Sequence, residues 1–144
     1  MLTKREIVLA KFLNQNPLNF KKGEEDFQYI YKDVDYLVLT PEESLNRVIN
    51  DFKEDFSSYY FSLAFLSKVI GVEEKVLENR LHQQLDKDNF LYGNDNLLAY
   101  IKETIGLDNL VKACVEANGG YGYYISGYDH SQVEKDGYLI YRCN

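Results

Sequence analysis

The chain ends in GGYGYYISGYDHSQVEKDGYLIYRCN (residues 119–144), and this stretch decides the fold that the whole sequence is expected to adopt. It contains six of the 13 tyrosines and is punctuated by glycines. Tyrosine and other β-prone residues alternate over 121–126 and again over 138–143, with the turn-forming pair Asp136-Gly137 before the second run. The pattern predicts two paired strands that close the domain.

A second hairpin is expected earlier, over residues 27–39, where β-prone residues flank the turn-forming run 32–35. The sequence Thr40-Pro41-Glu42-Glu43 follows it directly. This is a capping box, with a hydroxyl at the N-cap, proline at the first helical position and a glutamate that reaches back to the amide of the cap. It predicts a helix from 41 to about 54.

Apolar residues at helical spacing predict the remaining helices. Ser57 or Ser58 is a suitable cap for the second of them and Asp108 for the last, and a loop is expected over 86–94. The expected helices span residues 4–14, 59–70, 73–85, 95–105 and 108–117. The fold class is therefore α+β, with about six short helices packed on a small antiparallel sheet made of two hairpins. A length of 144 residues suits a single domain, residues 1–144.

Composition excludes several classes of protein. The two cysteines, Cys114 and Cys143, do not have the spacing of metal ligands, so we expect free thiols in a reducing compartment. The first residues are charged and no apolar run has the length of a membrane span, which predicts a cytoplasmic protein. A net charge of −7 argues against direct binding to nucleic acid.

The negative charge is concentrated in one block. Residues 24–55 contain ten acidic and three basic residues, and residues 1–23 contain one acidic and five basic. If the carboxylates project together, they would attract a basic cleft on a partner. A solvated helix face that keeps the protein soluble is the alternative. The candidate partner-binding carboxylates are Glu42, Glu43, Asp51, Glu54 and Asp55.

The tyrosines of the final stretch are the second candidate contact surface. Tyrosine offers a large amphipathic area and is enriched where proteins meet. We single out Tyr121, Tyr123 and Tyr128, with the neighbouring Asp129. The alternative is that these rings pack a half-buried strand.

Little in the sequence predicts catalysis. His130 with Asp129 and Glu134 has the residue types of a divalent metal site or an acid–base pair, but an exposed polar turn explains them equally. The glycines after the expected helix 108–117 precede a strand, which is the reverse of the order in phosphate-binding loops. We expect a protein that is not an enzyme and has no metal or cofactor.

Several motifs resemble a family of small acidic proteins that bacteriophages and related mobile elements encode. They are Tyr36–Ser44 (YLVLTPEES), Phe65-Leu66 with Gly71-Val72, Tyr128-Asp129, and Gly137–Arg142 (GYLIYR). Relatives carry a pattern similar to Asp-Gly-Arg-Gly-His-Phe before the Tyr-Asp pair, where this chain has Asn118–Tyr123 without the arginine and histidine. The resemblance implies a phage-like accessory protein that acts inside a bacterial host cell.

These observations predict a viral, inhibitory function. We expect the protein to bind and inhibit a nucleic-acid-targeting defence protein of the host, as an anti-CRISPR or antirestriction protein, by presenting its acidic surface to a basic one. The alternative is a non-catalytic interaction or dimerisation module that uses the C-terminal tyrosine-rich hairpin, including as a homodimer.

Overall fold

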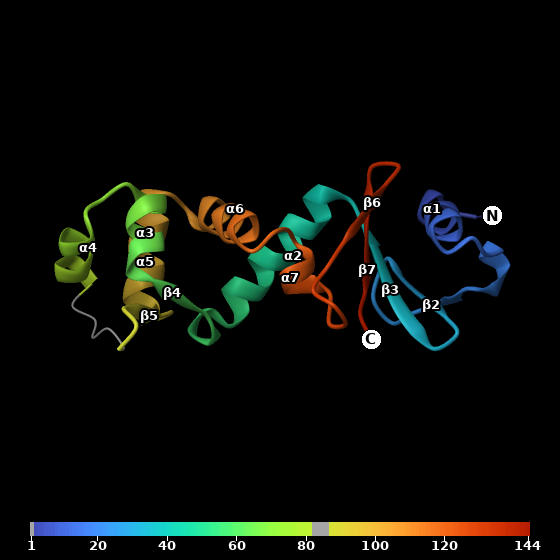
Figure 1. Ribbon diagram of the computed structural model, residues 1–144, viewed down its shortest axis with the longest axis horizontal. Coiled ribbons are helices and arrows are strands. Elements are labelled where there is room, and N and C mark those ends of the chain that lie inside the picture. Colours follow the sequence, from blue (N-terminus) through green and yellow to red (C-terminus); the bar gives the residue numbers. More distant parts are fainter. Residues whose placement is uncertain (1, 82–86) are drawn as a thin grey trace. The chain divides into compact units, whose positions relative to one another are not determined.

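The computed structural model describes residues 2–81 and 87–144. The chain divides into two compact units, Met1–Val48 with Val115–Asn144, and Ile49–Cys114. Helices and antiparallel sheets in these units confirm the α+β class (Figure 1). Every helix in the described part of the chain is too short or too polar to cross a membrane. The single domain stays a prediction.

The first unit is built on a five-stranded antiparallel sheet with the order β1-β2-β3-β7-β6 (Figure 1). The two hairpins, β2-β3 and β6-β7, share this sheet as predicted because β3 pairs with β7, which places Leu37 opposite Tyr141 and Leu39 opposite Leu139. The strands are β1 (Lys21–Lys22), β2 (Gln28–Tyr31), β3 (Val34–Leu39), β6 (Val133–Lys135) and β7 (Tyr138–Arg142).

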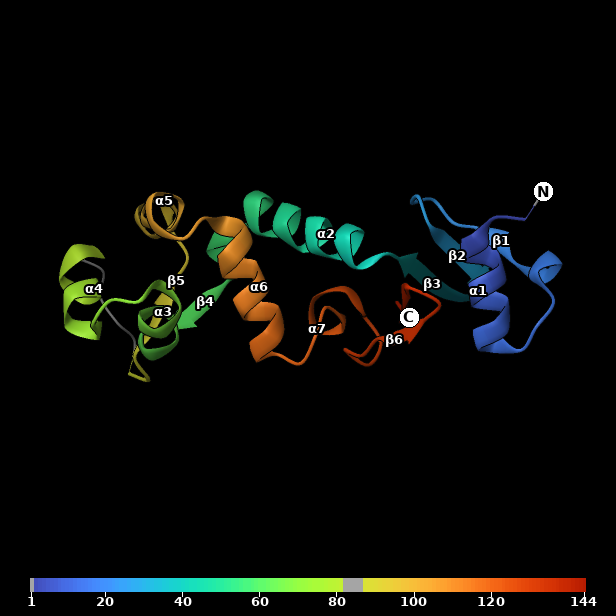
Figure 2. The ribbon, with the colours of Figure 1, turned by 90° about the horizontal axis from the view of Figure 1, so that it is seen from above.

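Helix α1 (Lys4–Leu13) lies against one face of this sheet (Figure 2). It begins with a capping box in which Thr3 and Glu6 bind each other's backbone amides. Its apolar side chains meet alternate residues of β2, β3 and β7, each worth about 1.5–3 kcal/mol when fully buried. The resulting core consists of Val8, Leu9, Tyr29, Tyr36, Val38 and Ile140.

Helix α2 (Pro41–Glu54) begins where the capping box predicts. Thr40 Oγ1 accepts from the Glu43 amide at 3.1 Å, and the Thr40 amide donates to Glu43 Oε1 at 2.7 Å. The next residue is the buried Ser44, whose hydroxyl accepts from the hydroxyl of Tyr141 at 2.8 Å. The first turns of α2 are therefore fixed to β7.

The second unit has a small antiparallel sheet and a core rich in aromatic rings. Phe52 is fully buried, and its ring stacks on Tyr59 with centroids 4.1 Å apart and lies within 6.5 Å of Phe56 and Phe61. The elements wholly within this unit are η2 (Phe56–Ser58), β4 (Tyr60–Ser62), α3 (Leu63–Ile70), α4 (Glu74–Leu81), β5 (Phe90–Tyr92) and α5 (Asp95–Thr104). Helix α6 (Leu107–Ala117), like α2, belongs to both units.

Several predicted boundaries are wrong in this unit. The helix expected over 59–70 begins at Leu63, because Ser62 is its cap and accepts from the Phe65 amide at 3.0 Å. Residues 60–62 instead pair with β5, which lies in the segment expected to be a loop. Asp108 lies in the first turn of α6 and does not precede it. Residues 82–85 of the helix expected over 73–85 lie outside the described residues.

The prediction of a strand over residues 121–126 is also wrong. The segment forms a short helix, α7 (Gly122–Ile125), in which Ile125 N donates to Tyr121 O and Ser126 N donates to Gly122 O. The buried residues are Gly122, Ile125 and Ser126, whose spacing suits a helical turn better than a strand. The partner of β7 in the final hairpin is therefore β6.

Candidate functional site

The loop between α7 and β6 is held in place by a buried serine. Ser126 is only 2% exposed, and its hydroxyl donates to the Arg142 carbonyl oxygen at 2.6 Å. The same oxygen lies 3.1 Å from Asp129 Oδ1 and accepts from the amides of Tyr128 and Asp129 at 3.4 Å. One hydroxyl therefore joins this loop to β7.

A glycine lets the loop pack directly against α7. A Cβ on Gly122 would lie 2.4 Å from the carbonyl carbon of Ser131, which is closer than real Cβ atoms come. The Gly122 amide also donates to Gln132 Oε1 at 2.9 Å. The loop is thus positioned from both ends before any partner binds.

This scaffold exposes two tyrosine rings. Tyr123 is 49% exposed and Tyr128 is 54% exposed. The Arg142 guanidinium lies 3.7 Å from the centre of the Tyr128 ring. The centres of the His130 and Tyr123 rings are 5.8 Å apart. Together with Asp129 these residues form what we call the C-terminal loop surface.

Two further predicted contact residues, Tyr121 and Asp129, differ from Tyr123 and Tyr128 in their surroundings. Burial raises the pKa of Tyr121, which is only partly exposed at the start of α7. Hydrogen bonds from Ser131 hold the pKa of Asp129 below its ordinary value. Asp129 therefore positions the loop as an ionised acceptor, while Tyr123 and Tyr128 supply the exposed area.

The metal or acid–base hypothesis for His130, Asp129 and Glu134 receives no geometric support. Asp129 Oδ1 is occupied by hydrogen bonds within the loop, and His130 Nδ1 lies 3.3 Å from the Tyr123 carbonyl oxygen. Among residues 2–81 and 87–144, no group of three or more His, Cys, Asp or Glu side chains is placed to hold a metal ion.

Glu43, one of the predicted carboxylates, is bound within the protein. Its two oxygens accept from the Arg5 guanidinium at 2.7 and 2.8 Å, and Arg5 also donates to the Val38 carbonyl at 2.7 Å. The guanidinium lies 3.6 Å from the centre of the Phe27 ring. The hydrogen bond from Arg5 lowers the pKa of Glu43, so this carboxylate fastens α1 to the first turn of α2, while the Val38 carbonyl fastens α1 to the sheet.

The other four predicted carboxylates differ in their surroundings. Glu42, Glu54 and Asp55 are exposed, whereas Asp51 is partly buried. Glu42 belongs to the first unit and the other three belong to the second. Asp55 accepts from the hydroxyls of Ser57 and Ser58. Their action as one acidic patch stays a prediction.

Sequence reasoning missed His130 and Arg142 as parts of the surface, and Ser126 as the buried residue that holds the loop. A signal for Ser126 was present, because a serine three residues before Asp129 in a glycine-containing loop is typical of a side-chain-bonded turn. The stacking of Arg142 on Tyr128 joins residues of different elements, so no local pattern predicts it.

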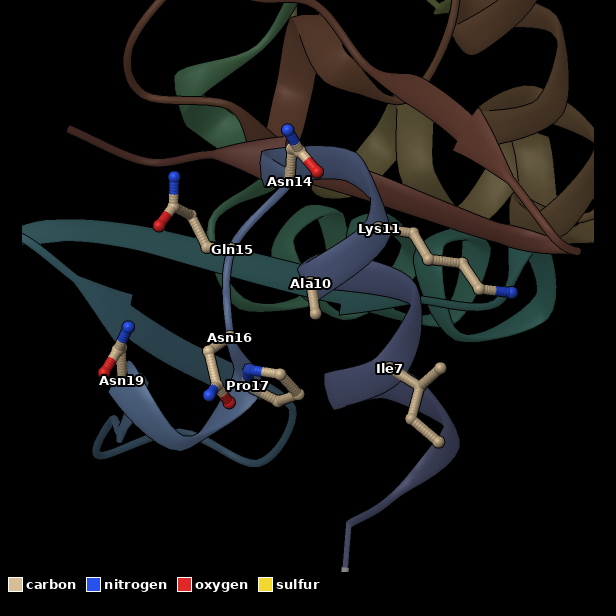
Figure 3. Close-up of a pocket in the computed structure, with 8 residues that line it drawn as sticks. All are labelled: Ile7, Ala10, Lys11, Asn14, Gln15, Asn16, Pro17 and Asn19. Atoms are coloured by element: carbon tan, nitrogen blue, oxygen red, sulfur yellow. The ribbon is translucent and has the colours of Figure 1, made fainter.

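The first unit also contains a pocket, and the residues that line it are distant in sequence from the C-terminal loop surface (Figure 3). It is formed by α1 and the segment that follows it, and its volume is about 440 Å³. The residues that line it are Ile7, Ala10, Lys11, Asn14, Gln15, Asn16, Pro17 and Asn19. We call it the α1 pocket.

Comparison with known proteins identifies no relative, so the resemblance to phage-encoded accessory proteins stays a prediction. No protein-family model, no curated protein and no solved structure matches this chain.

Proposed function

We propose that this chain is a non-catalytic protein-binding module and that the C-terminal loop surface is its contact with the partner. The observation that carries the proposal is the exposure of Tyr123, on α7, and of Tyr128, on the adjoining loop that Ser126 already holds in one conformation. A rigid loop loses little conformational entropy on binding, so more of the contact free energy appears as affinity.

The side chains of this surface suit a protein partner. A tyrosine buries a large apolar area at low entropy cost and its hydroxyl can still form a hydrogen bond. Arg142 covers one side of the Tyr128 ring and keeps that ring from turning freely. Tyrosine and arginine are the residue types enriched among those that dominate binding energy in protein interfaces.

Self-association through the sheet edges is a weaker candidate. The edge strands are β1, which consists of Lys21 and Lys22, and β6, which carries Glu134 and Lys135. Charged side chains on edge strands disfavour pairing with another edge. A different protein is therefore the better candidate for the partner than a second copy.

Affinity purification from a bacterial lysate tests this proposal. The wild-type chain and a Tyr123→Ala/Tyr128→Ala variant would serve as baits, with captured proteins compared by quantitative mass spectrometry. We expect one protein to be enriched by the wild type and its recovery to fall at least tenfold with the variant, because losing an interface anchor costs about 2 kcal/mol or more.

A Tyr60→Ala/Tyr92→Ala variant is the matched control, since these tyrosines of the second unit are 60% and 57% exposed. It should recover the partner as the wild type does. Equal recovery with the Tyr123/Tyr128 variant would show that the C-terminal loop surface makes no contact.

The charge distribution favours a second candidate, the inhibition of a nucleic-acid-targeting defence protein. The exposed carboxylates of the first unit include Glu24, Asp26 and Glu42, within the acidic block 24–55. Such a surface would compete with nucleic acid for a basic channel, and its binding would weaken as salt rises. If the chain is a phage-encoded protein, as its resemblance implies, inhibition of a host defence protein would protect the phage.

Plasmid-restriction and CRISPR-interference assays in a host that carries the defence system test this second candidate. Expression of the wild-type chain should restore plasmid transformation, and a Glu24→Lys/Asp26→Lys/Glu42→Lys variant should not. Glu116→Lys is the control, because Glu116 is an exposed acidic residue outside the block. If expression of the wild-type chain does not restore transformation in any assayed system, the protein does not inhibit those systems.

A further inference from the structure

The α1 pocket is formed by local backbone geometry. Asn14 ends α1 in the left-handed conformation, with a φ of 54°, which turns the chain back alongside the helix. The Gln15 amide donates to the Ala10 carbonyl at 3.0 Å, and Asn16 Oδ1 accepts from the Leu18 amide at 3.0 Å. The turn that closes the pocket is therefore set by hydrogen bonds within residues 10–18.

The lining combines side-chain amides with aliphatic groups. Four of the eight lining residues are Asn or Gln, and in Figure 3 Asn16 and Pro17 lie beside Ala10 of the helix. The side chains of Asn14, Gln15 and Asn19 have no hydrogen-bond partner in the described part of the chain and are exposed. Their donors and acceptors are available to a ligand.

The charge of the pocket favours an uncharged ligand. Lys11 is the one charged residue among those that line it, and its ammonium lies 3.5 Å from Asp136 Oδ2. In Figure 3 its side chain extends away from the amides. The carboxyl end of α1 carries a partial negative charge, which favours N–H donors over carboxylates.

We propose that the α1 pocket binds a short, uncharged, extended peptide segment that carries an aliphatic side chain. The side-chain amide of Asn or Gln offers one acceptor and two donors, which match the N–H and C=O of a peptide group. The aliphatic lining and the neighbouring Leu18, which is 80% exposed, suit an aliphatic side chain. No aromatic ring is among the eight lining residues, so the pocket offers no ring on which a sugar would stack.

The size of the pocket agrees with this occupant. A volume of about 440 Å³ lies within the range of small-ligand sites and accommodates one residue with its two flanking peptide groups. For a ligand of that size we expect a dissociation constant on the order of 1 mM, from the usual free energy per atom. The site would thus contribute to recognition of a longer chain rather than act alone.

NMR titration of the full-length ¹⁵N-labelled protein with N-acetyl-leucine-N-methylamide tests the proposal. We expect saturable shifts of the backbone amides of residues 10–19. N-acetyl-glycine-N-methylamide, which lacks the aliphatic side chain, should bind at least threefold more weakly. Absence of saturable shifts with the leucine probe, or equal binding of the glycine probe, would overturn the proposal.

Variants separate this site from a general effect on the fold. Gln15→Ala and Asn19→Ala remove exposed side-chain amides that make no hydrogen bond within the described part of the chain, so the fold should be kept and each should weaken binding several-fold. Asn46→Ala removes an exposed amide on α2 and should bind the leucine probe as the wild type does. Methyl glucoside is the rival probe, and tighter binding of this sugar than of the leucine probe would contradict a peptide site.

Discussion

The two units of this chain are stabilised in different ways. In the first unit, polar groups far apart in sequence hold the structure together, as in the pairing of Arg5 with Glu43 and of Tyr141 with Ser44. In the second unit, aromatic rings close in sequence form the core, and the Ser62 and Asn94 side chains cap α3 and α5 locally. The first unit should therefore respond more to changes in charge, and the second more to changes in side-chain volume.

The largest effect is expected from Phe52→Ala in the second unit. Phe52 is fully buried and stacks on Tyr59, so its truncation leaves a cavity and should cost about 3–5 kcal/mol of unfolding free energy. Denaturant unfolding with residue-resolved hydrogen exchange would measure the loss. Phe12→Ala, at a ring 38% exposed, is the control and should cost much less. Equal loss of protection in the five-stranded sheet would contradict the contrast between the units.

A smaller effect is expected from Arg5→Ala in the first unit. The change leaves Glu43 without its bidentate partner and removes the hydrogen bond to the Val38 carbonyl, which should cost about 2–3 kcal/mol. Hydrogen exchange of α1 should increase most. Lys11→Ala breaks the exposed ion pair with Asp136 and should have little effect. Equal effects of the two changes would mean that Arg5 does not hold α1 to the sheet.

Ser126→Ala should have a smaller effect, confined to the C-terminal loop. The Arg142 carbonyl and the loop amides lose their shared partner, at a cost of about 1–2 kcal/mol. Faster exchange of the amides of residues 126–131 would report this loss. Ser57→Ala, at an exposed serine of the second unit, is the control. An unchanged loop in the Ser126 variant would show that other contacts position the tyrosines.

The smallest effect is expected on the acid dependence of the free energy of unfolding. Because the pKa of Glu43 is lowered from its ordinary value of 4.5, the unfolded chain binds the proton more tightly than the folded one does. This stabilisation is complete above pH 4.5 and is lost as the pH falls through the lowered pKa of the folded state. Glu43→Gln should flatten the acid side of the unfolding curve of the first unit. The same acid dependence in the variant would rule out this ion pair as its source.

Much of the fold follows from local patterns in the sequence. The start of α2 at Pro41 is predictable because the hydroxyl, proline and glutamate of its capping box act within four residues. The hairpin 28–39 follows from β-prone residues around a turn. Tyr123, Tyr128 and Asp129 were singled out from the sequence and are exposed, whereas Tyr121 is partly buried; their role in binding a partner stays a prediction.

The failures share a physical cause. Residues 121–126 alternate as a strand would, yet they form α7 because Gly122 packs against the backbone of Ser131, nine residues later in the same unit. Residues 60–62 leave the expected helix because β5 offers them backbone partners. In both cases a contact with a distant segment outweighs a local preference that is worth less than about 1 kcal/mol per residue.

The sequence alone determined the α+β class, the capped helices and the excess of carboxylates between residues 24 and 55, because periodicity, capping and charge are properties of neighbouring residues. The pairing of β3 with β7, the ion pair of Arg5 with Glu43, and the bond by which Ser126 fixes the loop that exposes Tyr128 depend on the tertiary structure. Each of these contacts joins residues from different elements, and their free energy depends on distances that no local pattern specifies.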